Sequence, residues 1–181
     1  LRELVAPLVR DPASVPEVVI SDLTTDSRTA TPGCCFIAIS GTAAEGHDYI
    51  PQAVARGAVA LVYENEAYAA TLPAGVTAVK VPSSRRAAAV MANAFWDYPS
   101  RDLCVVPVTG TNGKTSTVHL LESIFQAVGY RTGMIGTLGR RLGGETVAAS
   151  RTTPDAVELH STLDRMRAAG VTHVTMELSS H

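Results

Sequence analysis

The N-terminal half of the chain alternates short apolar runs with polar turn residues, a spacing that is typical of a small α/β domain. The apolar runs predict strands at residues 17–21, 34–39, 58–63 and 76–81. Residues 50–56 have the periodicity of a helix that stops at Gly57, and residues 83–97 predict a second helix after Pro82. We therefore expect residues 1–100 to form one small α/β domain.

After a polar, proline-containing stretch at residues 98–102, the pattern changes, and we place a domain boundary near residue 100. Residues 103–109 predict a buried strand, which is followed by a glycine-rich turn. Residues 115–128 then predict a helix whose apolar face carries Val118, Leu121, Ile124, Phe125 and Val128. Residues 133–138 predict a second strand, and residues 139–149 predict a loop that carries Arg140, Arg141, Gly143 and Gly144.

The last part of the chain predicts one more helix and one more strand. Thr153 is expected to cap a helix that begins at Pro154 and ends at Gly170, and residues 171–178 predict a third strand. Strands that alternate with helices in this way predict a parallel sheet. Because the predicted sheet stops at its third strand, we expect the second domain, residues 101–181, to be incomplete.

Composition narrows the possible partners of this 181-residue chain. Its net charge is −2, and its basic residues are 13 Arg and 2 Lys without a polybasic block, so we expect neither nucleic acid nor an anionic membrane as a partner. No apolar run of about 18 residues is present. Three cysteines without a C-x-x-C spacing favour a reduced, cytoplasmic protein, and we expect a monomer.

The most informative segment follows the first predicted strand of the second domain. Val108-Thr109-Gly110-Thr111-Asn112-Gly113-Lys114-Thr115 resembles a phosphate-binding loop, although the general pattern has glycine where this chain has Val108. Glycines let backbone N–H groups approach phosphate, the lysine reaches the β- and γ-phosphates of ATP, and the next hydroxyl can hold Mg²⁺. The alternative is an ordinary glycine turn with a solvated Lys114.

Glu177 lies at the carboxyl end of the third predicted strand of this domain. Ligands of open α/β sheets bind at that end, and a carboxylate there can hold Mg²⁺ beside a phosphate-binding loop. The alternative is a solvated glutamate at the end of a strand.

These residues together resemble the Mur ligases, the ATP-dependent enzymes that build the stem peptide of peptidoglycan. Thr109–Thr115 is similar to their phosphate-binding loop, and Thr152-Thr153-Pro154-Asp155 with Met176-Glu177-Leu178-Ser179-Ser180-His181 resembles the MurE type. The N-terminal half also matches the family through Asp26-Ser27-Arg28, Pro32-Gly33, Glu45-Gly46-His47 and Gly57-Ala58.

The resemblance implies a role for each of several groups of residues. ATP would be bound by Gly110, Thr111, Asn112, Gly113, Lys114, Thr115 and Ser116, with Lys114 and Glu177 catalytic and Thr115 and Glu177 on Mg²⁺. The substrate UDP-N-acetylmuramoyl-L-Ala-D-Glu would contact Thr25, Ser27, Thr42, Ala43, Ala44, Thr152, Thr153, Ser179 and Ser180. For the segment around Ser27, a turn with a local ion pair is the alternative.

The implied reaction joins a third amino acid to the dipeptide through an acyl phosphate. Diaminopimelate is expected as that amino acid only because it is frequent in the family. The family's C-terminal domain has no counterpart in these 181 residues, so we expect an N-terminal fragment that does not complete the reaction alone.

Three other readings stay open. A different phosphate-binding-loop protein, such as a small kinase or GTPase, would need base-reading motifs that we do not find. A non-catalytic module that binds a UDP-sugar or a nucleotide is compatible with the same motifs. Another Mur-type ligase, such as MurF, is disfavoured by the segments at 152–155 and 176–181.

Overall fold

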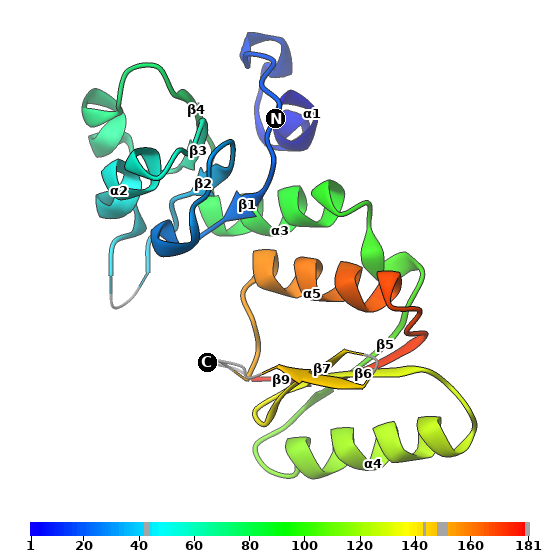
Figure 1. Cartoon of the computed structure of the whole chain (residues 1–181). Helices are drawn as coiled ribbons and strands as arrows, with labels where there is room; N and C mark the ends of the chain where they lie inside the picture. The colour runs from blue at the N-terminus through cyan, green and yellow to red at the C-terminus, as the bar shows by residue number, and fades with distance from the viewer. Residues whose placement is uncertain (42–43, 143, 148–151, 180–181) are drawn as a thin grey trace. The chain divides into compact units, whose positions relative to one another are not determined.

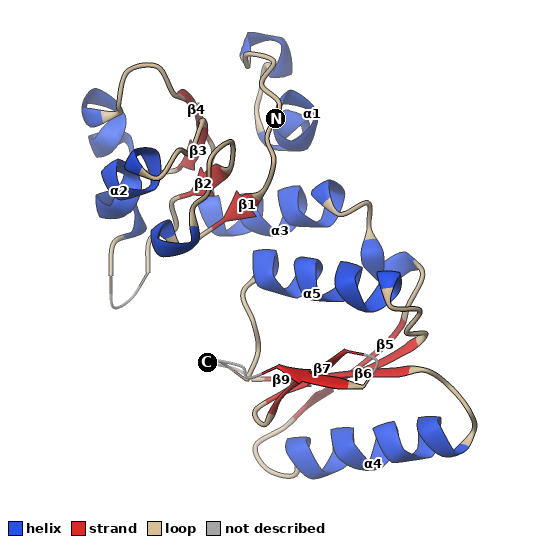
Figure 2. Cartoon of the chain, in the orientation of Figure 1, coloured by secondary structure: helices blue, strands red, loops and turns tan. Residues whose placement is uncertain are grey.

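The computed structural model describes residues 1–41, 44–142, 144–147 and 152–179. The chain divides into two compact units, Leu1–Phe95 and Trp96–His181. Both combine helices with parallel strands, which confirms the expected α/β class (Figure 2).

The α-helices of the described residues are α1 (Arg2–Val5), α2 (Ile50–Ala55), α3 (Ser84–Phe95), α4 (Lys114–Ala127) and α5 (Ala156–Ala168). The 3-10 helices are η1 (Ala6–Leu8), η2 (Pro12–Ser14), η3 (Ser27–Thr29), η4 (Gly46–Tyr49), η5 (Glu66–Thr71) and η6 (Pro99–Arg101). The strands are β1 (Leu23–Thr24), β2 (Cys35–Ile37), β3 (Ala60–Tyr63), β4 (Thr77–Lys80), β5 (Cys104–Thr109), β6 (Thr132–Gly136), β7 (Gly139–Leu142), β8 (Glu145–Val147) and β9 (His173–Leu178).

The first unit contains a parallel sheet in the order β1-β2-β3-β4. Its central strands β2 and β3 are buried along their whole length, as expected for strands whose two faces are both covered. Phe36 and Leu61 belong to the same core cluster as Ile50 and Ala53 of α2. The helices expected at 50–56 and 83–97 are therefore confirmed as α2 and α3, with small differences at their ends.

The strand expected at residues 17–21 is wrong, because the first strand of this unit is β1. Residues 17–21 belong to none of the strands in the described sheet; the side chain of Val19 is 93% exposed, and Val18 and Ile20 are only half-buried. A short apolar run alone therefore did not identify a strand here, because strand preference depends on packing against neighbouring strands.

The second unit is a sheet in the order β5-β9-β6-β7-β8, with α4 and α5 on opposite faces (Figure 1). Strands β5, β9 and β6 are parallel, which confirms the expected parallel sheet. The face toward α5 is apolar, and Ile135, Val174 and Met176 pack there against Leu163 and Met166 of the helix.

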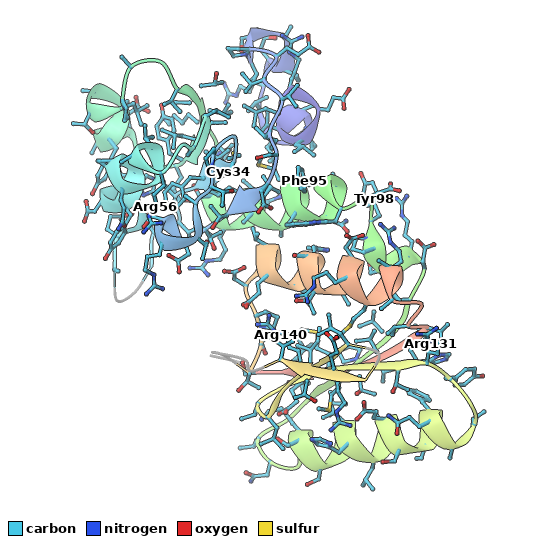
Figure 3. All side chains as sticks on the ribbon, viewed as in Figure 1. Cys34, Arg56, Phe95, Tyr98, Arg131 and Arg140 are labelled. Carbon is cyan, nitrogen blue, oxygen red and sulfur yellow. The ribbon has the colours of Figure 1, made fainter. Side chains whose placement is uncertain are left out.

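The loop expected at residues 139–149 is wrong, because β7 and β8 occupy most of the described part of that segment and pair antiparallel to their neighbours. Its two arginines made the segment look like solvated loop, but both are paired with glutamates of the helices. Arg140, labelled in Figure 3, is buried and pairs with Glu158 of α5. Arg141 donates to Glu122 of α4. Gly143, which the sequence also placed in this loop, lies outside the described residues.

Two expectations about burial in the second unit are also wrong. Strand β5 is not buried, because it lies at one end of the strand order and pairs only with β9 in the described sheet. This edge position explains how Pro107, which has no N–H group, fits in a strand. On α4, Val118 is buried, but Ile124 is 56% exposed, and Val128, which caps the helix at its C-terminal end, is exposed as well. The apolar face of α4 is thus narrower than the sequence indicated.

None of the helices in the described ranges combines the length and the apolar character that crossing a bilayer requires.

The packing of α5 gives a prediction about stability. Replacing the buried Leu163 with alanine should lower the free energy of unfolding by about 2–5 kcal/mol, because it leaves a cavity under α5. Leu120→Ala on α4 is the matched control, since Leu120 is 64% exposed and should change stability by no more than about 0.5 kcal/mol. Urea denaturation followed by circular dichroism measures both variants. Equal losses would contradict the packing described for α5.

Candidate functional site

The carboxyl ends of three parallel strands bring the candidate residues of the second unit together. In the register of the sheet, Thr109 of β5 lies beside Leu178 of β9, and Ile135 of β6 lies beside Met176. The loops that leave these strands therefore start at the same edge of the sheet. This is the edge at which open α/β sheets bind ligands.

The glycine loop between β5 and α4 needs two glycines for its conformation. Gly110 has φ = +147° and Gly113, the N-cap residue of α4, has φ = +81°, and L side chains rarely adopt either value. No side chain caps the helix at Gly113, so no side-chain acceptor occupies the first N–H groups of α4. Thr111, Asn112 and Ser116 are exposed in or beside this loop.

Lys114 is the first residue of α4, and its side chain folds back over the loop. Its Nζ donates to the carbonyl oxygen of Gly110 at 2.7 Å and to that of Thr111 at 3.4 Å. The ammonium is thereby held next to the positive N-terminal end of the helix. A cation and free backbone donors at one place can bind an anion such as phosphate.

Glu177 is 1% exposed, although the sequence left open that it might be solvated. Its Oε2 accepts from the Thr115 hydroxyl at 3.0 Å, and its Oε1 accepts from the Thr137 backbone N–H at 2.9 Å. Among the described residues, no lysine, arginine or histidine forms an ion pair with it. A buried carboxylate that has hydrogen bonds but no cation is a natural ligand for a metal ion.

Gly136, the last residue of β6, leaves the space that the Glu177 carboxylate occupies. A Cβ atom at Gly136 would lie 2.4 Å from Oε1 of Glu177, far closer than real contacts allow. The absence of a side chain at Gly136 is therefore part of the site.

The residues from 152 onward connect the loop before α5 to the end of β9. The Thr153 hydroxyl donates to the Glu177 carbonyl oxygen at 3.1 Å and accepts from the Ser179 N–H at 2.8 Å. The expected capping role of Thr153 is wrong, because Asp155 is the N-cap residue of α5 and accepts from the Glu158 N–H at 2.9 Å. Thr153 instead links the loop before α5 to the end of β9. Asp155, two residues closer to the helix, provides the cap.

Thr137 was missed by sequence reasoning. Its hydroxyl donates to Oε2 of Glu177 at 3.3 Å and lies 3.1 Å from the Thr152 hydroxyl. The available signal was the one that identified Glu177, namely a polar residue directly after a buried parallel strand.

The candidate residues of the first unit are only partly described. Ser27 is buried, and its hydroxyl donates to Oε1 of Gln52 at 2.6 Å. Thr25 is half-buried, whereas Ala44 is exposed and its carbonyl oxygen accepts from the Gly41 N–H at 3.0 Å. Thr42 and Ala43, like Ser180 of the second unit, lie outside the described residues.

The segment around Ser27 also contains the ion pair that the sequence offered as its alternative explanation. Arg28 forms a two-pronged pair with Asp26, and its Nη2 lies 2.6 Å from the carboxylate. This pair and its hydrogen bond raise the pKa of Arg28. Asp26 also caps η3 by accepting from the Arg28 N–H, so its carboxylate has a structural role.

Strand, glycine loop and helix, with a buried carboxylate on the adjacent strand, define an α/β unit of the class that binds phosphates at the carboxyl edge of its sheet. Comparison with known families narrows this class. The model described as "Mur ligase family, catalytic domain" matches residues 19–96, and the Mur ligase middle domain matches residues 108–181. The chain belongs to the Mur ligase family, which confirms the resemblance.

Curated relatives agree with this assignment. The chain is 43% identical to the UDP-N-acetylmuramoyl-L-alanyl-D-glutamate--2,6-diaminopimelate ligase of Geobacillus thermodenitrificans, over 92% of this chain and 32% of the relative. It is 41% identical to the enzyme of the same name from Gloeobacter violaceus, over 100% of this chain and 36% of the relative. The chain thus spans about a third of the length of these relatives.

Solved structures show the same fold. A structure of a UDP-N-acetylmuramoyl-L-alanyl-D-glutamate--2,6-diaminopimelate ligase matches with a TM-score of 0.69 and 27% identity, over 90% of this chain and 32% of that one. MurF from Acinetobacter baumannii matches with a TM-score of 0.60 and 26% identity, over 90% of this chain and 31% of that one.

The close approach of Gly136 and Glu177 can be tested by a double-mutant cycle. Gly136→Ala should lower the free energy of unfolding by about 1–3 kcal/mol, because the new methyl group overlaps the carboxylate. In a Glu177→Ala background the methyl group has space, and we expect a coupling of about 1–2 kcal/mol between the two sites. Urea denaturation of the four proteins measures this coupling. An equal cost of Gly136→Ala in both backgrounds would refute the contact.

Proposed function

We propose that the chain supplies the substrate-binding part and the first nucleotide-binding part of an ATP-dependent ligase of the MurE type. Such an enzyme adds 2,6-diaminopimelate to UDP-N-acetylmuramoyl-L-alanyl-D-glutamate in peptidoglycan synthesis. The observation that carries the proposal is the buried Glu177, which forms no ion pair among the described residues and lies 3.0 Å from Thr115 at the end of the glycine loop. The names of the curated relatives supply the substrate and the amino acid.

The glycine loop suits the phosphates of ATP. Gly110 and Gly113 expose backbone N–H groups, and α4 directs its N-terminal end to the same place. Lys114 is held at the loop by the carbonyl oxygen of Gly110, beside the backbone groups that are proposed to bind the β- and γ-phosphates. Gly110, Gly113 and Lys114 together form the proposed binding site for a triphosphate.

Thr115 and Glu177 fit Mg²⁺. Magnesium holds its ligands in an octahedron at about 2.0–2.1 Å, so two neighbouring ligand oxygens lie about 2.8–3.0 Å apart. The 3.0 Å between Oγ1 of Thr115 and Oε2 of Glu177 matches this separation. No cluster of at least three His, Cys, Asp or Glu side chains occurs among the described residues, and Mg²⁺ beside phosphates needs only one or two protein ligands. When bound, the ion would neutralise charge on the phosphates.

The proposed reaction has two steps. An oxygen of the D-Glu carboxylate attacks the γ-phosphorus of ATP, the bond to the β-phosphate oxygen breaks, and ADP leaves. The amino group of the incoming amino acid then attacks the acyl carbon, loses a proton and expels inorganic phosphate. Lys114 stabilises negative charge that builds up on the phosphates in the first step, and the positive end of α4 acts in the same direction.

The first unit is proposed to bind the UDP end of the substrate through Thr25, Ser27, Thr42, Ala43 and Ala44. The N–H of Gly41 donates to the carbonyl oxygen of Ala44 at 3.0 Å. Glu45, the next residue, forms a hydrogen bond with the buried His47, which lowers the pKa of the Glu45 carboxyl. Gly41, Ala44 and Glu45 are thus each tied to a neighbouring group beside the proposed site. Thr152, Thr153, Ser179 and Ser180 are proposed to contact the muramoyl-dipeptide.

A MurF-type ligase is the second candidate, because MurF structures share the fold at 26% identity. The diaminopimelate ligase is favoured because its structure matches with the higher TM-score and the curated relatives at 41–43% identity carry its name. The proposal also implies a cytoplasmic monomer that acts on small molecules, without nucleic acid or membrane partners.

The two lysines of the chain offer a matched test of ATP binding. Lys114→Ala should weaken ATP affinity at least about tenfold, since a hydrogen bond to a charged group contributes about 1.5–3 kcal/mol. Lys80→Ala is the control, because Lys80 pairs with Glu66 on the surface of the first unit. Isothermal titration calorimetry with ATP and Mg²⁺ measures both. Unchanged affinity in Lys114→Ala would refute the phosphate role of the loop.

Substrate binding has its own test. The chain should bind UDP-N-acetylmuramoyl-L-Ala-D-Glu, and UDP alone should compete, because the first unit is proposed to hold the diphosphate end. Thr25→Val should weaken both ligands by a similar factor, since it removes a hydroxyl from the proposed UDP site. Competition calorimetry measures these affinities. Failure of UDP to compete would place the substrate elsewhere.

A further inference from the structure

A continuous row of oxygen atoms links the proposed substrate side of the second unit to the glycine loop. The Thr152 hydroxyl lies 3.1 Å from the Thr137 hydroxyl, which lies 3.3 Å from Oε2 of Glu177. The same Oε2 lies 3.0 Å from the Thr115 hydroxyl. Four side chains from four separate segments thus form one row, in which Thr137 lies between Thr152 and Glu177.

The direction of the protons in this row follows from the carboxylate. Ionised Glu177 can only accept hydrogen bonds, so the single hydroxyl proton of Thr137 is directed to it. The Thr137 oxygen then accepts a hydrogen bond from the Thr152 hydroxyl, so the single proton of that hydroxyl is already used in this bond. The Thr152 oxygen has only lone pairs left, and a ligand that meets it must offer an N–H or an O–H group.

Two contacts from Thr137 fix the orientation of the carboxylate. The backbone N–H holds Oε1, and the hydroxyl holds Oε2 on the side of Thr115. The backbone contact is independent of the side chain, whereas the hydroxyl contact depends on it. Substitutions at position 137 can therefore remove one contact while the other stays.

We propose that Thr137 is a positioning residue that couples the substrate side to the nucleotide side. A substrate N–H or O–H group that donates to the Thr152 hydroxyl fixes the orientation of that hydroxyl. Thr152 in turn fixes the Thr137 hydroxyl, and Thr137 fixes the Glu177 carboxylate beside Thr115. The bound muramoyl-dipeptide then raises the affinity for ATP with Mg²⁺, and bound ATP with Mg²⁺ raises the affinity for the muramoyl-dipeptide by the same factor, as linkage requires. This inference rests on the proposed function and adds to it a connection between the two ligands.

The test measures ATP affinity of the 181-residue chain with and without saturating UDP-N-acetylmuramoyl-L-Ala-D-Glu, in the presence of Mg²⁺. A non-hydrolysable ATP analogue serves as the probe. In the unmodified chain, the dipeptide substrate should raise the affinity for the ATP analogue about fivefold or more, which is the lower end of the usual range of coupling. Thr137→Val should reduce this factor to below about twofold, and Thr137→Ser, which keeps a hydroxyl, should restore it.

Two further variants separate coupling from a general loss of structure. Thr146→Val, at an exposed threonine of β8 in the same unit, should keep the full factor. Thr152→Val should reduce the substrate-induced increase in ATP-analogue affinity as much as Thr137→Val does. The double variant should reduce it no further than either single variant, because both residues belong to one row. Circular dichroism confirms that each variant is folded.

The outcomes distinguish this inference from the proposed function. If the unmodified chain binds both ligands independently, or if Thr137→Val keeps the full factor, the inference is overturned and the proposed function stands. If the unmodified chain does not bind the nucleotide analogue at all, both are overturned.

Discussion

The second unit depends on one costly arrangement, the burial of the Glu177 carboxylate without a cationic partner in the part of the chain that the structure describes. A charged group removed from water needs hydrogen bonds or a counter-ion, and here the hydroxyl of Thr115 and the N–H and hydroxyl of Thr137 provide the hydrogen bonds. These donors come from the start of α4 and from the turn after β6. Their position fixes the start of α4 relative to the sheet, and with it the glycine loop.

The order of the strands explains why the donors can meet at one carboxylate. Because β9 pairs with β5 on one side and β6 on the other, its last residues lie between the two loops that follow those strands. A central strand of a parallel sheet is covered on both faces, which accounts for the burial of Glu177, the penultimate residue of β9. Gly136 completes the arrangement, since any side chain there would occupy the space of the carboxylate. Topology thus determines the chemistry available at this edge.

The parts of this unit that were predictable from sequence are those with local signals. The glycine loop, the helix that follows it and the parallel strands each have a periodicity or a turn residue of their own. Strands β7 and β8 were not predictable, because Arg140 and Arg141 look solvated until Glu158 and Glu122 of the helices are known to meet them. Thr137 escaped for a related reason, since its importance lies in contacts with residues 15 and 40 positions away. Spacing along the chain carries no direct sign of such contacts.

The choice of basic residues gives a separate argument for the glycine loop. The chain has 13 Arg and 2 Lys, and its ion pairs within the second unit use arginine, as at Arg140, Arg141 and Arg167. Arginine suits a planar carboxylate partner, whereas lysine carries a compact charge at the end of a flexible stem. At position 114 the ammonium folds back to within 2.7 Å of the Gly110 carbonyl oxygen, over glycines that leave no side chain in its way. A broader, planar guanidinium fits this tight approach poorly. Position 114 is therefore a lysine although most basic residues of the chain are arginines. This is expected where the geometry of the loop, as well as the positive charge, limits which side chain fits.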